Sequence, residues 1–221
     1  MERNVYSLVL LEDVVQAVDR LACARGTSRS GLINQILADY LSCTTPEERI
    51  REIFGRMEQM LTDSENIQVR SPESGTRLTM RSTLRYRYHP TVRYALELSR
   101  REGAAVGELR ISLRTQNRQL ETLLTAFFKF REHMENRWIG SRFPGGRVPC
   151  EIGPGRYCRT LPYPASEEDR TSERIAEAIC AYIREFDREL KRYFSSSDNP
   201  APTGAVLERS YRDYLNSSIL I

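Results

Sequence analysis

The stretch that decides the fold lies close to the start of the chain and reads Asn4-Val5-Tyr6-Ser7-Leu8-Val9-Leu10. Side chains at every second position share a face, so Tyr6, Leu8 and Leu10 lie together. The opposite face carries Val5, Ser7 and Val9. A repeat of period two over six or seven residues is typical of a β-strand. The sequence therefore predicts a strand over residues 4–10.

Two helical patterns follow this strand directly. The first opens on Glu12 and Asp13 and ends at Gly26, which suits a helix C-terminus. Its apolar residues recur at helical spacing: Val14, Val15, Val18, Leu21 and Ala22. The second begins after Ser28, a favoured N-cap residue. Its apolar stripe consists of Leu32, Ile33, Ile36, Leu37, Tyr40 and Leu41. The sequence predicts a helix from each pattern.

One strand and two short helices are too little to fold alone. About 43 residues is near the lower limit for a core that lacks a metal or a disulfide, and a single strand leaves both edges unpaired. Two copies remove both problems, because their strands can pair antiparallel while four helices cover them from one side. The pattern therefore predicts a homodimer or a higher oligomer.

Residues 3–43 resemble the ribbon-helix-helix superfamily, of the CopG, Arc and MetJ type. The resemblance rests on the alternating strand, Leu21-Ala22, Gly26, Ser28-Arg29-Ser30, Ile33 and Tyr40. It covers about a fifth of the chain, and the three elements fit without a gap. In this superfamily the paired strands enter the major groove of double-stranded DNA. The resemblance implies a dimeric, cytoplasmic, sequence-specific DNA-binding protein, namely a transcriptional regulator that acts as a repressor.

The resemblance also implies which residues contact DNA. It places Val5, Ser7 and Val9 toward the bases, with Arg3 at the edge of the ribbon. Valine can touch a thymine methyl group but makes no hydrogen bond, so base specificity rests on Ser7, on Arg3 or Asn4, and on DNA shape.

A second set of residues is implied to hold phosphate. Ser28, Arg29 and Ser30 would place the N-terminus of the second helix, with its free N–H groups, against a phosphate of the DNA.

The remainder of the chain predicts an α+β domain. The alternation returns over residues 77–114 and predicts a three-stranded antiparallel meander that is apolar on one face and arginine-rich on the other. Two long helices, at about 116–137 and 166–194, are expected to cover the apolar face. Between them lies a Gly/Pro-rich connection, residues 139–165.

Four parts of the chain are predicted in all. They are a ribbon-helix-helix domain over 1–44, a connecting helix and linker over 45–75, an α/β domain of unknown role over 76–195, and a tail over 196–221. The connecting helix is expected to start at a capping box in Thr45-Pro46-Glu47-Glu48.

Charge is distributed unevenly along the chain, although the net charge is only +3. Residues 1–44 carry four Arg against five acids, whereas residues 76–115 carry nine Arg against three Glu. The second basic surface would comprise Arg81, Arg85, Arg87, Arg93, Arg110 and Arg114. One interpretation is a solvated strand face with cross-strand pairs through Glu97 and Glu108. The other is a phosphate-contacting surface or a site for an anionic effector.

The sequence lacks the motifs of several classes of functional site. The glycines at 145–146 and 153–155 lack the spacing of a phosphate-binding loop. Five scattered cysteines are typical of reduced thiols in the cytoplasm. With only His89 and His133, the sequence predicts no metal site, no cofactor and no enzyme. The apolar runs are shorter than the roughly 20 residues that span a bilayer, so no membrane partner is expected.

Two alternatives to a repressor remain open. In the first, the ribbon-helix-helix unit serves only for dimerisation, and the C-terminal domain binds a protein or a small effector. The net negative charge of residues 1–75 favours this alternative, as do the two valines on the side of the predicted strand that would face the DNA groove. In the second, the chain is an accessory DNA-binding protein of a plasmid or mobile element.

Overall fold

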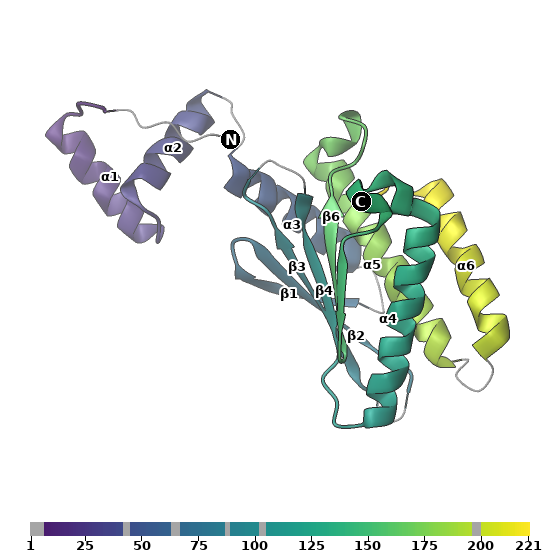
Figure 1. Ribbon diagram of the computed structural model, residues 1–221. Coiled ribbons are helices and arrows are strands. Elements are labelled where there is room, and N and C mark those ends of the chain that lie inside the picture. The colour runs from purple at the N-terminus through teal and green to yellow at the C-terminus, as the bar shows by residue number, and fades with distance from the viewer. Residues whose placement is uncertain (1–6, 42–44, 63–66, 87–88, 102–104, 196–199) are drawn as a thin grey trace. The chain divides into compact units, whose positions relative to one another are not determined.

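The structure is a computed structural model that describes residues 7–41, 45–62, 67–86, 89–101, 105–195 and 200–221 (Figure 1). The chain divides into two compact units, Met1–Arg49 and Ile50–Ile221. The described residues form six α-helices and one six-stranded antiparallel sheet, so the predicted α+β class is confirmed. The division falls after Arg49, whereas the sequence predicted boundaries after residues 44 and 75.

The N-terminal unit contains a pair of helices, α1 (Glu12–Ala24) and α2 (Arg29–Tyr40). The turn between them needs Gly26, whose φ of +60° suits glycine. Val18, Ala22 and Leu32 are buried between the two helices. Residues 7–11 form no strand in the single chain, and residues 4–6 of the predicted strand lie outside the described residues. A strand needs a hydrogen-bonding neighbour, and residues 7–11 have none in one chain.

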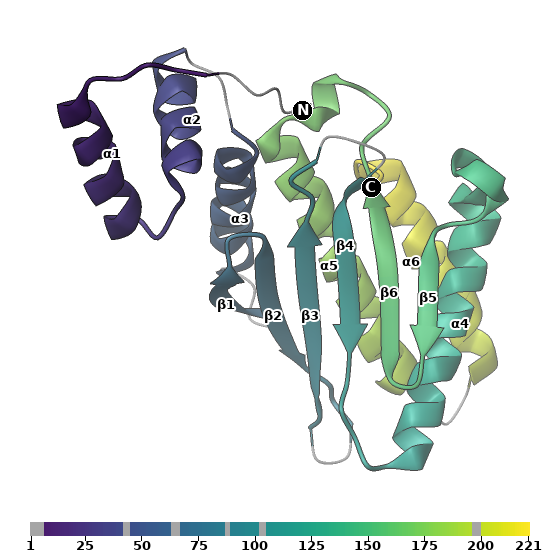
Figure 2. The same cartoon turned by 60° about the vertical axis from the view of Figure 1, so that its left-hand side comes forward.

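The sheet of the second unit has the strand order β1-β2-β3-β4-β6-β5, and every neighbouring pair is antiparallel (Figure 2). The predicted meander region holds β2 (Arg77–Thr83), β3 (Thr91–Leu98) and β4 (Ala105–Ser112). Three strands were not predicted: β1 (Ile67–Ser74), β5 (Cys150–Gly153) and β6 (Arg156–Pro162). The predicted linker and the predicted Gly/Pro-rich connection therefore contain strands.

Four helices accompany the sheet: α3 (Pro46–Thr62), α4 (Arg118–Ile139), α5 (Ser172–Ser195) and α6 (Pro200–Ser217). Short 3-10 turns occupy Gly140–Arg142, Pro144–Gly146 and Glu168–Arg170. The helices lie on one side of the sheet, behind the strands in Figure 2. The capping box of α3 is confirmed, because Glu48 N donates to Thr45 Oγ1 at 3.2 Å and Thr45 N to Glu48 Oε2 at 3.0 Å. The region predicted as a tail contains α6.

The main core lies between the sheet and these helices. Apolar side chains from alternate strand positions meet apolar side chains of α3, α4 and α5. The largest include Met57, Leu61, Tyr94, Phe127, Phe128, Tyr157, Tyr182, Phe186 and Tyr211. Edge-to-face ring contacts run through the centre, such as Phe127 with Phe186 at 5.5 Å between ring centroids. Helix α3 contributes five buried side chains to this core, so it belongs to the second unit over most of its length.

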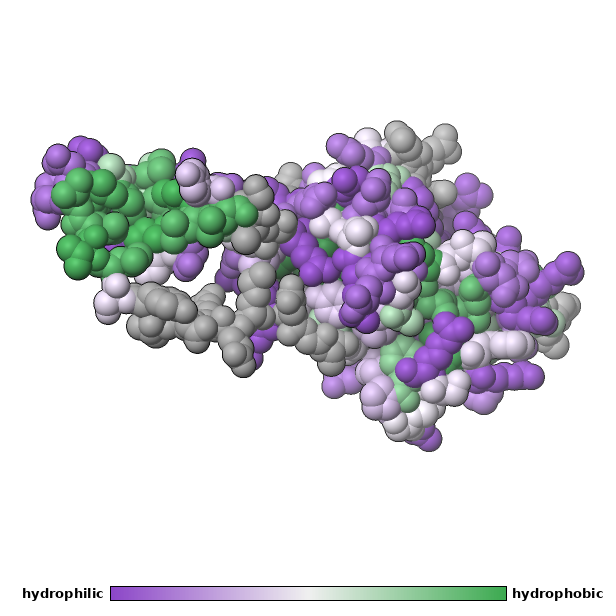
Figure 3. Space-filling model, turned by 90° about the horizontal axis from the view of Figure 1, so that it is seen from above, coloured by the Kyte–Doolittle hydropathy of each residue, from purple (hydrophilic) through white to green (hydrophobic). Residues whose placement is uncertain are grey.

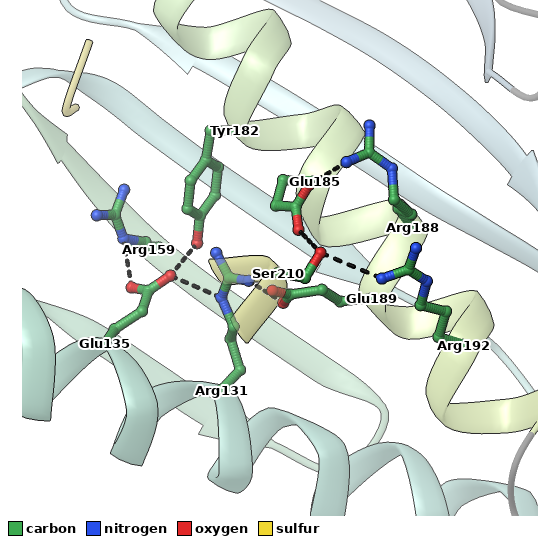
Figure 4. Close-up of polar contacts among 9 residues, drawn as sticks. All are labelled: Arg131, Glu135, Arg159, Tyr182, Glu185, Arg188, Glu189, Arg192 and Ser210. Atoms are coloured by element: carbon green, nitrogen blue, oxygen red, sulfur yellow. Dashed lines mark hydrogen bonds and ion pairs between the residues drawn. The ribbon is translucent and has the colours of Figure 1, made fainter. Parts of the chain in front are cut away.

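Four charged residues are buried together between α4, α5 and β6, and we call them the buried ionic cluster: Arg131, Glu135, Arg159 and Glu189 (Figure 4). Arg131 Nε donates to Glu135 Oε1 at 2.9 Å, and Arg159 Nε donates to Glu135 Oε2 at 2.9 Å. Arg131 Nη1 also donates to Glu189 Oε2. The four side chains are at most 1% exposed. Glu135 thus joins α4 to β6, and Arg131 joins α4 to α5.

Aromatic side chains complete the surroundings of the two arginines. Tyr182 OH donates to Glu135 Oε1 at 2.8 Å. The guanidinium of Arg131 lies 4.4 Å from the ring centroid of Tyr211, and that of Arg159 lies 4.4 Å from the ring of Tyr182. Burial alone would raise the pKa of Glu135, but Arg159 and Arg131 hold that pKa below its usual value. Glu135 is therefore ionised at neutral pH.

Helix α6 is attached to α4 and α5 by polar contacts around this cluster. Ser210 Oγ donates to Glu185 Oε1 at 2.7 Å and accepts from Arg192 Nη1 at 3.2 Å (Figure 4). At the end of α4, Trp138 Nε1 donates to Glu208 Oε1 at 3.0 Å. Leu207 and Tyr211 are buried, so α6 contributes to the fold of the second unit.

The first prediction concerns the stability that depends on Glu135. The substitution Glu135→Ala leaves two buried arginines without their shared carboxylate, which should cost about 3–5 kcal/mol of unfolding free energy. The control is Glu177→Ala, since Glu177 forms an exposed pair with Arg174 on α5 and such pairs contribute about 0–1 kcal/mol. Denaturant unfolding measures both variants. Equal losses for the two would contradict the structural role of Glu135.

The second prediction concerns pH. Burial raises the pKa of Glu189 to about 7, against the opposing effect of Arg131. The unfolded carboxyl, with its ordinary pKa of about 4.3, loses its proton first as the pH rises. Stability contributed by Glu189 should therefore fall between about pH 4.5 and 7, by on the order of 1–3 kcal/mol. The variant Glu189→Gln should lack this component when unfolding free energies are measured across that range. Parallel pH profiles for the two proteins would show that Glu189 does not titrate there.

Candidate nucleic-acid interface

The residues predicted to contact DNA bases lie at or before the start of the described chain. Arg3 and Val5 fall outside the described residues. Ser7 and Val9 are exposed in the extended segment that leads into α1. Leu8 and Leu10, from the opposite face of the predicted strand, are also exposed, and Leu8 is 62% exposed. In the single chain this segment therefore buries neither of its faces.

The residues predicted to contact phosphate come together at the first turn of α2. Ser28 is the N-cap, and its Oγ accepts a hydrogen bond from Gly31 N at 3.1 Å. Ser30 follows in the first turn and is exposed. This local geometry leaves a helix N-terminus at the surface, where backbone N–H groups favour an anion.

Arg29 has a partner that sequence reasoning missed. Its Nε donates to Asp19 Oδ1 at 2.5 Å, and its Nη2 donates to Asp19 Oδ2. The hydrogen bond and the charge of Asp19 raise the pKa of Arg29. The two residues lie ten positions apart on different helices, so only the geometry of the helix pair brings them together. A phosphate at this helix terminus has to compete with the Asp19 carboxylate for the guanidinium.

Apolar side chains gather on the surface of the N-terminal unit (Figure 3). We call them the N-terminal apolar face: Leu8, Leu10, Leu11, Val14, Leu21, Ile36, Leu37, Tyr40 and Leu41. Val14 and Leu21 are two helical turns apart on α1, and Ile36 and Tyr40 one turn apart on α2, so each pair shares a helix face. Exposed patches of this kind are typical of interaction surfaces.

The arginine-rich strand face lies opposite the helices, and we call it the open face. Strand register places its side chains in three rows that cross the sheet. The first row is Gln68, Arg81, Arg93, Ser112 and Arg156. The second is Arg70, Thr79, Ala95, Arg110, Cys158 and Glu151. The third is Arg77, Glu97, Glu108 and Thr160.

The open face unites only half of the predicted basic surface. Arg81, Arg93 and Arg110 lie on it together. Arg85 and Arg114 are exposed but lie beyond the ends of their strands, and Arg87 is outside the described residues.

Three further arginines share the face: Arg70, Arg77 and Arg156. Two of these were missed because β1 and β6 were not predicted. The expected cross-strand pairing of Glu108 is replaced by a contact within β4, with Arg110 Nη2 donating to Glu108 Oε1 at 2.9 Å.

The described part of the chain forms neither a metal site nor a reactive cysteine pair. No three His, Cys, Asp or Glu side chains there are grouped to hold a metal ion. Cys150 lies opposite Arg159 on the helix side of the sheet, whereas Cys158 lies on the open face. Burial raises the pKa of each thiol to about 11, so neither is a ready nucleophile.

A shallow depression of about 410 Å³ lies at the third-row end of the open face. Glu97 and Glu108 stand directly opposite each other there, beside Ser99, Arg101 and Thr160. The buried ionic cluster is elsewhere and is inaccessible to a ligand.

No helix in the described segments is long and apolar enough to cross a membrane. Comparisons with protein-family models, curated proteins and solved structures find no match to this chain. The functional argument therefore rests on the surfaces described above.

Proposed function

We propose that this chain is a dimeric, sequence-specific DNA-binding protein, a transcriptional repressor in which residues 3–43 of two copies form a ribbon-helix-helix unit. The observation that carries the proposal is the N-terminal apolar face, which includes Leu8 and Leu10 from residues 7–10, the described part of the alternating segment, where no strand forms in one chain. A second copy supplies both missing parts, a neighbour for the strand and a cover for the helices.

Burial explains why a second copy suits this surface. Each fully buried Leu, Ile or Val side chain contributes roughly 1.5–3 kcal/mol, and the face carries nine large apolar side chains. Pairing residues 4–10 antiparallel would turn Leu8 and Leu10 onto the helices. Ser7 and Val9 would then point away, toward the groove of DNA.

A second candidate function is dimerisation without DNA contact. The specific observation that favours it is the bidentate pair between Arg29 and Asp19. Because Asp19 already balances the positive charge beside the α2 terminus, the predicted phosphate anchor is weaker than an unpaired arginine. Under this alternative, ligand or protein binding falls to the second unit.

The third prediction tests assembly. The protein should be at least a dimer at micromolar concentration, and Leu8→Asp should shift it to a monomer, because a charge would replace an apolar side chain at the strand pair. Leu8 is exposed in one chain, so the substitution does not disturb the fold of the monomer. The control is Val206→Asp, an exposed apolar position on α6. Sedimentation velocity measures the molecular mass of each protein in solution. A monomeric wild-type protein would overturn the proposal.

The fourth prediction separates the two functions. Arg29→Ala should weaken binding to all DNA sequences about equally and lower the salt slope by roughly one unit per subunit. Asp19→Asn should act in the opposite direction, because it releases Arg29 from its carboxylate. Fluorescence anisotropy with a DNA duplex at several salt concentrations measures both. Superimposable curves for wild type and Arg29→Ala would favour dimerisation alone.

A further inference from the structure

We propose that the open face of the sheet is a second nucleic-acid surface, one that holds the phosphate backbone of duplex DNA without reading its sequence. Every residue of this surface lies in the second unit, from residue 68 to residue 160. The inference therefore stands whether or not residues 3–43 insert a ribbon into the major groove.

Positive charge is concentrated in two of the three rows. The first and second rows carry five arginines, Arg70, Arg81, Arg93, Arg110 and Arg156, against the carboxylate of Glu151, and Arg110 also forms an ion pair with Glu108 of the third row. The third row carries Arg77 with Glu97 and Glu108. One edge of the face therefore attracts anions, and the other edge repels them. A bound phosphate backbone would therefore run across the strands, along the first and second rows.

The register brings two basic residues together, since Arg81 of β2 stands directly opposite Arg93 of β3. Guanidinium groups match phosphate oxygens in bidentate geometry, and hydrogen bonds between two charged groups are among the strong ones. A phosphate at this place can therefore be contacted from two adjacent strands.

The centre of the open face is buried although the helices of the second unit lie on the other side of the sheet. Thr79 is only 1% exposed, and Ala95 and Cys158 are also buried. In the second row Arg70 lies beside Thr79, and Arg110 lies between Ala95 and Cys158; the aliphatic stem of an arginine can lie along a sheet while its charged group stays in water. Thr79 Oγ1 is buried there without a hydrogen-bond partner. The open face thus combines small, buried side chains at its centre with arginines beside them.

The composition of the face selects a duplex over other partners. Its three rows contain no aromatic side chain among the described residues, so bases of a single strand have nothing to stack on. They contain no large apolar side chain either, so a protein partner lacks the anchor that protein interfaces use. What remains is charge and hydrogen-bond donors, which suit a phosphate backbone.

The dimensions also fit. The five arginines span β1 to β6, which is four strand spacings or about 19 Å. Duplex DNA carries one charge per roughly 1.7 Å of its axis, so about 11 phosphates lie within that span. Because that count includes both strands, about half of these phosphates belong to each strand, and the five arginines span several of them.

The fifth prediction uses the full-length protein and a short mixed-sequence DNA duplex. The test variant combines Arg70→Gln, Arg81→Gln and Arg156→Gln. Binding should weaken at least tenfold at low salt, and the slope of log affinity against log salt should fall by two to three units, about one for each arginine. The matched control combines Arg51→Gln, Arg118→Gln and Arg142→Gln, which removes the same charge from exposed positions away from the open face. The control should bind as the wild type does.

A second variant guards against a folding defect. Glu151→Gln removes the carboxylate from the second row and should strengthen duplex binding, which misfolding cannot do. Two competitors test the choice of partner: a single strand of the same sequence and polyglutamate of equal charge. Either of them binding as tightly as the duplex would overturn the proposal, as would equal losses in the test and control variants.

The results of this experiment can be told apart from those of the Arg29→Ala experiment on the α2 N-terminus. Loss of binding in the open-face variant with none in Arg29→Ala supports the open face and argues against the ribbon-helix-helix contact. The reverse result overturns the open face and leaves that contact standing.

Discussion

Burying two arginines beside one carboxylate is the constraint on which the second unit depends. Arg131 and Arg159 come from α4 and β6, and both need Glu135. Removing any one of the three leaves a charge in the core, so the helix and the strand can pack in few alternative ways. Glu189 and Tyr211 extend the same requirement to α5 and α6. A packing interface of apolar residues alone would tolerate small shifts that this arrangement does not.

The same constraint governs the surface on the other side of the sheet. Strand β6 alternates, so Tyr157 and Arg159 face the helices while Arg156 and Cys158 face outward. A slip of one residue would exchange the two sets. The ion pair between Arg159 and Glu135 holds the register, and the register places Arg156 in line with Arg81 and Arg93. The charge pattern of the open face is thus a consequence of a contact in the core.

Local patterns predicted much of this fold, and long-range contacts account for what they missed. Strong alternation identified the regions of β2, β3 and β4, and helical spacing identified those of α4 and α5. The sequence predicts a linker in place of β1, because Ser71-Pro72 is typical of a turn. It predicts a loop in place of β5 and β6, because Gly153-Pro154-Gly155 lies between them. The partners of the ionic cluster lie 24 and 58 residues apart. The predicted strand over residues 4–10 stays a prediction, because a strand pair between two copies cannot form within one chain.

The contact between Trp138 and Glu208 has an optical consequence. Trp138 is the one tryptophan of the chain, and it lies where α6 meets the end of α4, with the guanidinium of Arg212 4.9 Å from its ring. Tryptophan fluorescence, excited selectively over that of the 11 tyrosines, therefore reports from a single place, the contact between α6 and the end of α4. Separation of α6 would expose the indole further and remove Glu208 and Arg212 from it, while the neighbouring Arg137 of α4 would remain. The fluorescence of Trp138 can therefore show whether α6 stays packed against α4.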